Sequence, residues 1–149
     1  MAKNIMTIKS DLIKVETVVN APIEKVWEYW AAPKHIVKWN NASEDWHTTE
    51  AKNDLRIGGK FTSRMEAKDG SFGFDFGGVY TEVRLYEVTS YVLGDGRKVE
   101  INFINEENKT KIIENFEGEN ENPPEFQQMG WQAILDNFKK YSEQVENIN

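Results

Sequence analysis

The residue best placed to do chemistry in this sequence is an acidic one, Glu114. It lies in the segment KTKIIENFEG, where the alternation of an extended strand puts Thr110, Ile112, Glu114 and Phe116 on one face. Because its neighbours on that face are mostly apolar, we expect the face to point into the core. A lone buried carboxylate is costly, so its pKa should rise or it should find a partner.

A cation on a neighbouring segment is the candidate partner for this carboxylate. Arg97 has the same strand phase as Val99, Ile101 and Phe103, which we also expect to point inward. Two interpretations of Glu114 remain open. It forms a structural pair with Arg97 or reaches water at a strand end, or it orients a polar group of a bound ligand.

The sequence contains none of the familiar catalytic or metal-binding motifs. It has no cysteine, and its two histidines, His35 and His47, stand outside any H-E-x-x-H pattern. No G-x-S-x-G elbow and no phosphate-binding loop occurs. We therefore predict no catalytic residue, no metal and no cofactor, and we expect a structural or surface role for both histidines. A protein that is not an enzyme is favoured.

Aromatic side chains are abundant, with five Trp, eight Phe and five Tyr in 149 residues. Ligand pockets are lined mostly by such residues, but so are filled cores, and the sequence does not distinguish the two. If a gap remains between sheet and helix, the predicted ligand-binding residues are Trp46, Phe61, Met65, Phe74, Phe76, Arg97, Ile101, Phe103, Glu114, Trp131 and Leu135.

A long helix is predicted from Asn122 to Val145. Asn122 is suited to cap it, Pro123 to its first turn, and Glu125 to the third position after the cap. An apolar stripe then recurs at helical spacing, consisting of Trp131, Ile134, Leu135, Phe138, Tyr141 and Val145. A stripe of this length must lie on a broad surface, which a sheet can supply.

The remaining segments predict a sheet with two helices inserted after its first strand. Residues 1–10 form a short tail, and the run from Asp11 alternates as a half-buried strand. A helix opens at Asn20 and Pro22, Pro33 breaks it, and a short helix follows from Lys34 to about Trp39. About six extended segments come next. The chain is thus predicted to be α+β, with a strongly bent antiparallel sheet around the last helix, in one domain spanning 1–149 with a core at about 11–145.

Two glycines interrupt the longest extended run, SFGFDFGGVYTEVRLYEV. Glycine inside a strand often marks a bulge, so we predict a bulge or sharp bend at Gly77-Gly78. A bulge changes the phase of the strand. The residues predicted to point inward are therefore Phe72, Phe74 and Phe76 before it, and Val79, Thr81, Val83 and Leu85 after it.

Charge and hydropathy exclude two classes of partner. The net charge of −7 argues against binding a phosphate backbone, which requires a basic face. No segment approaches the roughly 20 apolar residues that a spanning helix needs, and no signal-peptide pattern is visible. We therefore expect no nucleic-acid partner, no membrane insertion and a cytoplasmic location. The sequence leaves open whether the protein is a monomer or a homodimer.

Three segments together resemble a known family. They are APIEKVWEYWAAPKHIVKWN, LRIGGKFTSRMEAKDGSFGFDFGGVYTEV and GWQAILDNFKKY. The chain resembles the SRPBCC superfamily, which has the START-related or Bet v-like helix-grip fold. Within it, the chain is similar to the branch named after the C-terminal domain of the activator of the 90-kDa heat-shock protein ATPase. The resemblance implies about seven strands around the last helix, with a hydrophobic cavity between them.

The resemblance implies no fixed chemistry, so three hypotheses follow. The first is a module that binds a hydrophobic, lipid- or polyketide-like small molecule between the sheet and the last helix. The second is a protein-interaction domain with a chaperone partner, as the family name suggests. The third, which the missing catalytic constellation disfavours, is a cyclase-type enzyme that uses Glu114 or His47 as acid or base.

Overall fold

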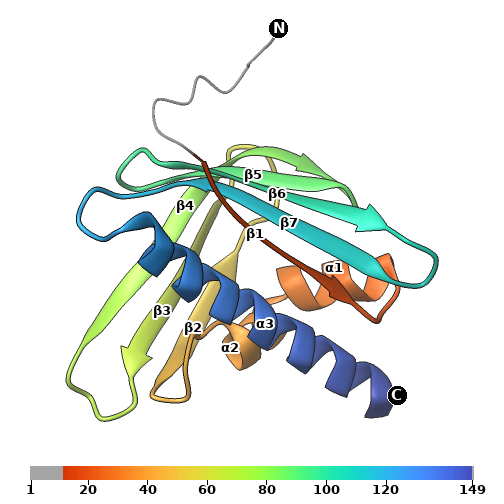
Figure 1. The fold of residues 1–149 in the computed structure, drawn as a ribbon, viewed down its shortest axis with the longest axis horizontal. Helices are drawn as coiled ribbons and strands as arrows, with labels where there is room; N and C mark the ends of the chain where they lie inside the picture. Colours follow the sequence, from red (N-terminus) through yellow and green to blue (C-terminus); the bar gives the residue numbers. More distant parts are fainter. Residues whose placement is uncertain (1–11, 149) are drawn as a thin grey trace, which may run out of the picture.

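A computed structural model describes residues 12–148, which form ten helices and strands (Figure 1). The short tail predicted for residues 1–10 lies outside this range. The three helices are α1 (Ile23–Ala31), α2 (Pro33–Trp39) and α3 (Pro124–Ile148). The seven strands are β1 (Leu12–Val19), β2 (Trp46–Asn53), β3 (Lys60–Ala67), β4 (Gly73–Arg84), β5 (Val88–Leu93), β6 (Lys98–Asn105) and β7 (Thr110–Glu117).

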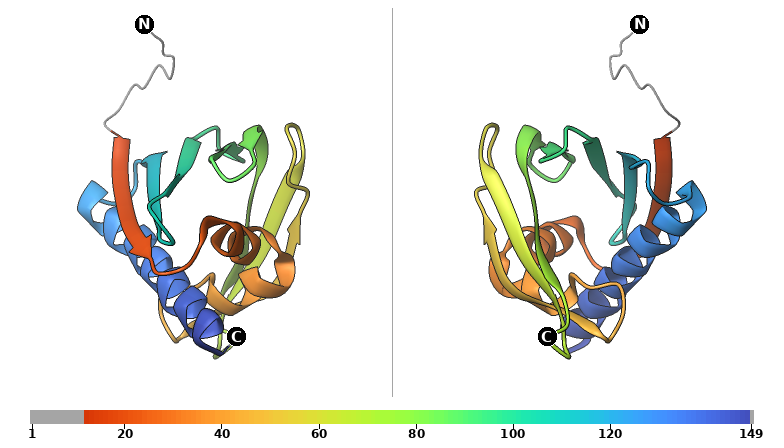
Figure 2. Two further views of the ribbon diagram at one scale, coloured as in Figure 1. Left: turned by 90° about the vertical axis from the view of Figure 1, so that its right-hand side faces the viewer. Right: turned by 90° about the vertical axis from the view of Figure 1, so that its left-hand side faces the viewer.

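All seven strands belong to one antiparallel sheet with the order β1-β7-β6-β5-β4-β3-β2. The sheet curls into a half-barrel whose two edges are β1 and β2 (Figure 2). Helices α1 and α2 lie between the two limbs of the curl, and α3 runs along its open side (Figure 2). This arrangement confirms the predicted α+β fold, a curved sheet around a long C-terminal helix with two short helices after the first strand.

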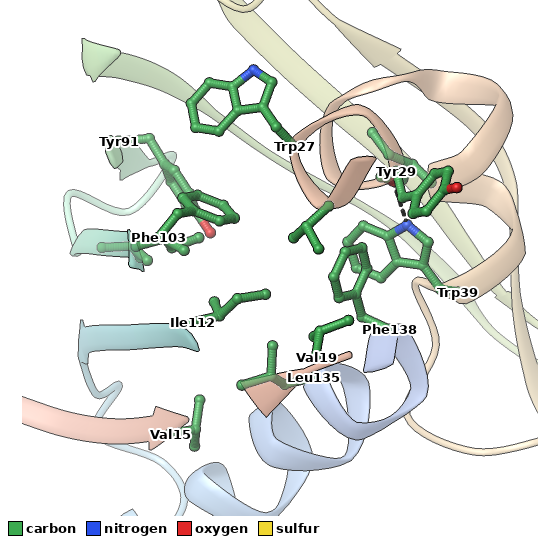
Figure 3. Close-up of a cluster of buried hydrophobic side chains, with 14 of the residues drawn as sticks. Val15, Val19, Trp27, Tyr29, Trp39, Tyr91, Phe103, Ile112, Leu135 and Phe138 are labelled. Atoms are coloured by element: carbon green, nitrogen blue, oxygen red, sulfur yellow. Dashed lines mark hydrogen bonds between the residues drawn. The ribbon is translucent and has the colours of Figure 1, made fainter. Parts of the chain in front are cut away.

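Aromatic side chains join α1, α2 and α3 at one end of the concave face. The ring of Phe138 on α3 packs edge-on against Trp30 and Trp39, with ring centroids 4.8 and 4.9 Å apart. The Trp39 indole nitrogen donates a hydrogen bond of 2.9 Å to the Tyr29 carbonyl, shown as a dashed line in Figure 3. The two short helices are thereby held to the long one and close that end of the sheet.

The exposed edge of β1 is covered by polar side chains of α3. Gln128 and Gln132 donate to the carbonyls of Lys14 and Glu16, at 2.9 and 3.1 Å, and Lys139 Nζ donates to the Val18 carbonyl at 2.7 Å. Unpaired edge carbonyls invite pairing with another chain, and these contacts satisfy alternate ones along the strand. The helix therefore contributes both apolar burial and edge protection.

The start of α3 differs from the prediction by two residues. The helix begins at Pro124, so Pro123, rather than Asn122, occupies the cap position. Asn122 is held from the preceding loop, because its backbone and side-chain nitrogens both donate to the Glu119 carboxylate. The residue before a proline is disfavoured in helical conformation, so Pro123 stays outside the helix and the second proline, Pro124, takes the first helical position, which the capping pattern alone did not take into account.

The predicted bulge at Gly77-Gly78 is wrong. Pairing of β4 with β3 is continuous through both glycines, pairing with β5 begins at Gly78, and the register shift lies between Tyr80 and Glu82. Val79, Thr81 and Leu85 are consequently exposed, and Tyr80 points inward and is buried. The glycines serve close approach instead. A Cβ at Gly77 would lie 2.5 Å from the Phe61 carbonyl oxygen, and one at Gly78 would lie 2.6 Å from that of Val92.

A turn at residues 85–87, which the sequence did not reveal, divides the longest predicted strand. Its central residue, Tyr86, has a φ of 66°, a left-handed conformation that usually selects glycine or asparagine. The Tyr86 ring packs edge-on against Trp27, at 6.0 Å between centroids. The turn contains no glycine, asparagine or proline, and its central residue is instead packed against α1.

Candidate functional site

A pocket of about 400 Å³ lies among the concave face of the sheet, the α2 end of the helical pair and the N-terminal half of α3. Its wall is predominantly apolar and aromatic, with contributions from β2 to β7. The lining residues are Trp30, Ile36, Trp39, Asn40, Ala42, Trp46, Lys52, Asn53, Phe61, Ser63, Met65, Phe74, Phe76, Tyr80, Thr89, Tyr91, Ile101, Glu114, Gly130, Trp131 and Ile134.

The structure brings together eight of the eleven residues singled out from the sequence. These eight, all on the pocket wall, are Trp46, Phe61, Met65, Phe74, Phe76, Ile101, Glu114 and Trp131. Trp131 on α3 stacks on Phe116 of β7, with ring centroids 3.8 Å apart, and meets Phe76 of β4 edge-on at 6.2 Å. The long helix is therefore positioned over the sheet by aromatic contacts at the pocket itself. That these residues contact a ligand stays a prediction.

Phe103 and Leu135 do not line the pocket. Phe103 packs against two tryptophans of α1, Trp27 and Trp30, at 5.1 and 5.7 Å between ring centroids. Leu135 is completely buried in the core, one helical position round from the pocket-lining Ile134. Both side chains point into the core, as the spacing along the strand and the helix predicted. Helix α1 covers the part of the concave face where Phe103 lies.

Arg97 is neither on the pocket wall nor paired with Glu114. Its guanidinium binds Asp95 at 2.7 Å, and its backbone nitrogen donates to the same carboxylate at 3.1 Å. Both residues belong to the turn before β6, where Gly96 has a φ of 92°. A partner two residues away in a tight turn competes more effectively for the guanidinium than a buried carboxylate on β7.

Glu114 is the buried charge of the pocket. It is 5% exposed, pairs across the sheet with Ile101 of β6 and Val15 of β1, and has Ile112 and Phe116 on the same face. Among residues 12–148, no hydrogen bond or ion pair reaches its carboxyl group within the usual distances. Burial therefore acts unopposed and raises the pKa of Glu114 to about 8. At neutral pH the empty pocket holds this group mostly as a neutral acid.

Two hydroxyl groups on β5 share the pocket with this acid. Thr89 is 2% exposed, pairs with Ile101 across the sheet, and its Oγ1 has no hydrogen-bond partner among the described residues. Tyr91 lies two residues further along the same strand face. Burial, and next the nearby Glu114 carboxylate, raise the pKa of Tyr91 well above its ordinary value. Buried polar groups are nearly always satisfied, so this cluster is unusual.

Four other polar side chains of the wall are paired with one another, and Lys52 is exposed to solvent. The Tyr80 hydroxyl donates to Asn53 Oδ1 at 2.6 Å, and Asn40 Nδ2 donates to Ser63 Oγ at 3.2 Å. Burial raises the pKa of the Tyr80 hydroxyl above that of an ordinary tyrosine, so this hydroxyl stays a neutral donor. The first pair joins β4 to β2, and the second joins the end of α2 to β3. The buried pocket-wall groups for which the structure gives no protein partner, Glu114, Thr89 and Tyr91, lie on β5 and β7.

Sequence reasoning missed Tyr80, Thr89 and Tyr91 for two reasons. Placing the bulge at the glycines inverted the phase of β4 beyond them, and the unseen turn at 85–87 merged β4 with the start of β5. The alternation VTSYVL in β5 does carry the signal, because Thr89, Tyr91 and Leu93 share a face. Phe72 was likewise predicted to point inward. It is 62% exposed and packs on Trp46 at the hairpin end.

Neither histidine lies in the pocket. His35 Nδ1 is 2.6 Å from the Tyr141 hydroxyl, in a contact between α2 and α3, and His47 is exposed on β2. Within residues 12–148, no group of three or more His, Asp or Glu side chains is arranged to hold a metal ion. None of the described helices is both long and apolar enough to span a bilayer.

Comparison with known proteins identifies relatives of the whole fold. The family model described as "Activator of Hsp90 ATPase homolog 1-like protein" matches residues 20–143. The chain is similar to the AHSA1-like protein from Aeromonas hydrophila, at 45% identity and a TM-score of 0.83, with 89% of this chain and 94% of that one covered.

Two further solved structures extend the likeness. Chr148 from Cytophaga hutchinsonii is 51% identical with a TM-score of 0.79, over 94% of this chain and 97% of that one. Protein CV1439 from Chromobacterium violaceum, at 24% identity and a TM-score of 0.79 over 90% and 99%, shares the fold. A comparison with curated proteins gave no match.

Proposed function

The chain belongs to the family of Activator of Hsp90 ATPase homolog 1-like proteins, and on that premise we propose that it binds a hydrophobic small molecule in the pocket between sheet and α3. The observation that carries the proposal is an apolar pocket of about 400 Å³ that contains a buried acid with no protein partner. Pockets for small molecules have this volume, this apolar wall and a few convergent polar groups.

Apolar burial would provide most of the affinity. Trp46, Phe61, Phe76 and Trp131 present faces and edges of aromatic rings to the pocket. Removing apolar surface from water is worth about 25 cal/mol per Å² before the costs of binding are subtracted. The Glu114 side would fix the orientation of the ligand, because an unsatisfied buried polar group gains most from a new hydrogen bond.

The proposal can be tested with a substitution that reduces the pocket volume without disturbing the fold. Gly130 lies on α3 and lines the pocket, and a Cβ added there meets nothing within 4 Å. We expect Gly130→Leu to fold at least as stably as the wild type, since glycine is a poor helix residue. It should bind ligands at least about tenfold more weakly, because its side chain takes up pocket volume. Quenching of tryptophan fluorescence by a panel of flavonoids, fatty acids and steroids measures this.

A second leucine substitution on α3, outside the pocket, distinguishes the effect of lost pocket volume from the effect of adding a leucine to the helix. Lys140 is exposed on the same helix and is not on the pocket wall. Lys140→Leu should bind the panel as the wild type does. If no member of the panel binds the wild type, or if Gly130→Leu binds as tightly as the wild type, the pocket is not the binding site.

A second candidate function, interaction with a chaperone, has a separate observation in its favour. Phe72 and Phe74 at the β3–β4 hairpin are 62% and 39% exposed, and both pack on Trp46. Clustered exposed apolar rings mark interaction surfaces. The deciding measurement is the ATPase rate of a 90-kDa heat-shock protein from the same host, with this protein added. Stimulation that Phe72→Ser abolishes would favour this function, and an unchanged rate would exclude it.

A further inference from the structure

The polar groups that remain unsatisfied in the pocket all lie on one side of it. Glu114 on β7 and Thr89 on β5 both pair with Ile101 on the strand between them, so they stand in one row across the sheet. Two strand spacings separate them, roughly 10 Å between backbones. Tyr91 follows Thr89 on the same face. One side of an otherwise apolar cavity thus presents the Glu114 carboxyl group and the Tyr91 side chain, with Thr89 Oγ1 buried within the wall beside them.

This side of the pocket consists of groups that can all accept hydrogen bonds. A carboxylate is an acceptor with two oxygens, and each hydroxyl oxygen accepts as well as donates. One cation lies near this side, Arg97, which acts electrostatically on Tyr91, but its guanidinium is paired with Asp95 and is not part of the pocket wall. Lys52 also lines the pocket, but it lies on β2 and is exposed to solvent. A ligand with several N–H donors satisfies the β5–β7 side best.

We propose that the pocket takes a hydrophobic amine, with its nitrogen against the Glu114 carboxylate, on the side of the pocket that Tyr91 also lines. The inference rests on the proposed binding function and adds the chemical class of the ligand. An ammonium group supplies three donors, and the Glu114 carboxylate offers two acceptor oxygens. The ammonium group also neutralises a buried carboxylate, which is costly when unpaired. The aromatic wall adds rings over which a cation is attracted.

Anionic ligands fit the same side poorly. Burying a second carboxylate beside Glu114 would force two like charges together or keep one of them protonated. The net charge of −7 also disfavours the approach of anions. A hydroxyl group is accommodated as a single donor. The expected order of affinity is therefore amine, then alcohol, then the unsubstituted hydrocarbon, with the carboxylate weakest.

Binding of an amine beside Glu114 should release a proton that can be measured. The ionisable groups that face the pocket are Glu114, Tyr91, Tyr80 and Lys52. Glu114 has a pKa of about 8 in the empty pocket, so at pH 7 it carries a proton that must leave when an ammonium binds. The bond to the Glu114 proton breaks, the proton passes to solvent, and the carboxylate pairs with the ammonium. About 0.9 proton per ligand should be released at pH 7.

The experiment compares four ligands that share a biphenyl body: 4-phenylbenzylamine, 4-phenylbenzyl alcohol, 4-methylbiphenyl and biphenyl-4-carboxylate. Tryptophan quenching gives the affinities, and calorimetry at pH 7 in two buffers of different ionisation enthalpy gives the protons released. We expect the amine to bind about 10- to 100-fold more tightly than the methyl compound, the range for a hydrogen bond to a charged group. Only the amine should release a proton.

Two variants assign the effect to one carboxyl group. Glu114→Gln keeps the size and removes the charge, so the amine should lose its advantage and the released proton while the methyl compound changes less than about threefold. Glu100→Gln is the matched control, because Glu100 lies on the opposite face of β6 and bonds Asn102. It should behave as the wild type does.

The outcomes separate the two proposals. Equal binding of amine and methyl compound, or an amine preference that persists in Glu114→Gln or comes without proton release, overturns the amine inference and leaves the binding function standing. Tightest binding of the carboxylate points to Lys52 and also overturns it. If none of the four compounds quenches tryptophan fluorescence, the pocket does not bind biphenyl compounds, and both proposals fail.

Discussion

Phe138→Ala should lower the free energy of unfolding by roughly 3–5 kcal/mol, the usual cost of deleting a fully buried large aromatic side chain. The Phe138 side chain is 0% exposed and meets Trp39 edge-on, at 4.9 Å between ring centroids (Figure 3). It meets Trp30 edge-on as well, at 4.8 Å. Its removal leaves a cavity where α1, α2 and α3 meet. Those helices cannot close the gap easily, because α3 is also held to the edge of β1 by Gln128 and Lys139.

The same helix offers a control of the same residue type. Phe126 is 63% exposed in the first turns of α3, so Phe126→Ala should change stability by less than about 0.5 kcal/mol. Urea titrations followed by circular dichroism measure both variants. Equal effects of the two substitutions, or a loss below about 1 kcal/mol for Phe138→Ala, would contradict the idea that α3 is held mainly by this buried cluster.

The fold was largely predictable because its patterns are local. The apolar stripe of α3 is carried by neighbouring residues, and so are the turns that the structure forms at Asp69-Gly70 and Asp95-Gly96. Gly70 and Gly96 adopt φ angles of 79° and 92°, which glycine permits without strain. The turn around Tyr86 has no such residue and depends on contact with Trp27, which is distant in sequence. Local pattern therefore missed it.

The site was predictable only as far as strand phase allowed. Phase alone placed Glu114 and Ile101 on the concave face, and both line the pocket. Phase does not say which part of that face α1 and α2 fill, so it could not separate Phe103 from Ile101. It also could not tell that the Arg97 guanidinium would bind Asp95 rather than Glu114. Those outcomes depend on tertiary packing and on competition between partners.

The stability of the protein should fall as the pH rises from about 5 to about 9, and Glu114→Gln should remove most of that fall. The pKa of Glu114 is about 8 in the folded protein against 4.5 for an ordinary glutamate. Between these values the folded state keeps a proton that the unfolded state has released. Stability therefore decreases with pH, by about 1.4 kcal/mol per unit for one proton.

Integrated over that window, Glu114 should cost roughly 4 kcal/mol at pH 9 relative to pH 4, and Glu114→Gln should be more stable than the wild type by about this amount above pH 8. Below pH 5 the two should be nearly equal, because a protonated carboxyl group and an amide are similar in size and neutral. Urea titrations at half-unit steps of pH measure the difference. Glu106→Gln, in the exposed β6–β7 turn, is the matched control and should run parallel to the wild type. If the stability of Glu114→Gln also changes with pH in parallel with the wild type, the wild-type Glu114 carboxyl group ionises in the folded state as it does in water. A confirmed gain would mean that the chain retains a destabilising acid where an amide would suffice, which is expected of a residue that serves binding rather than folding.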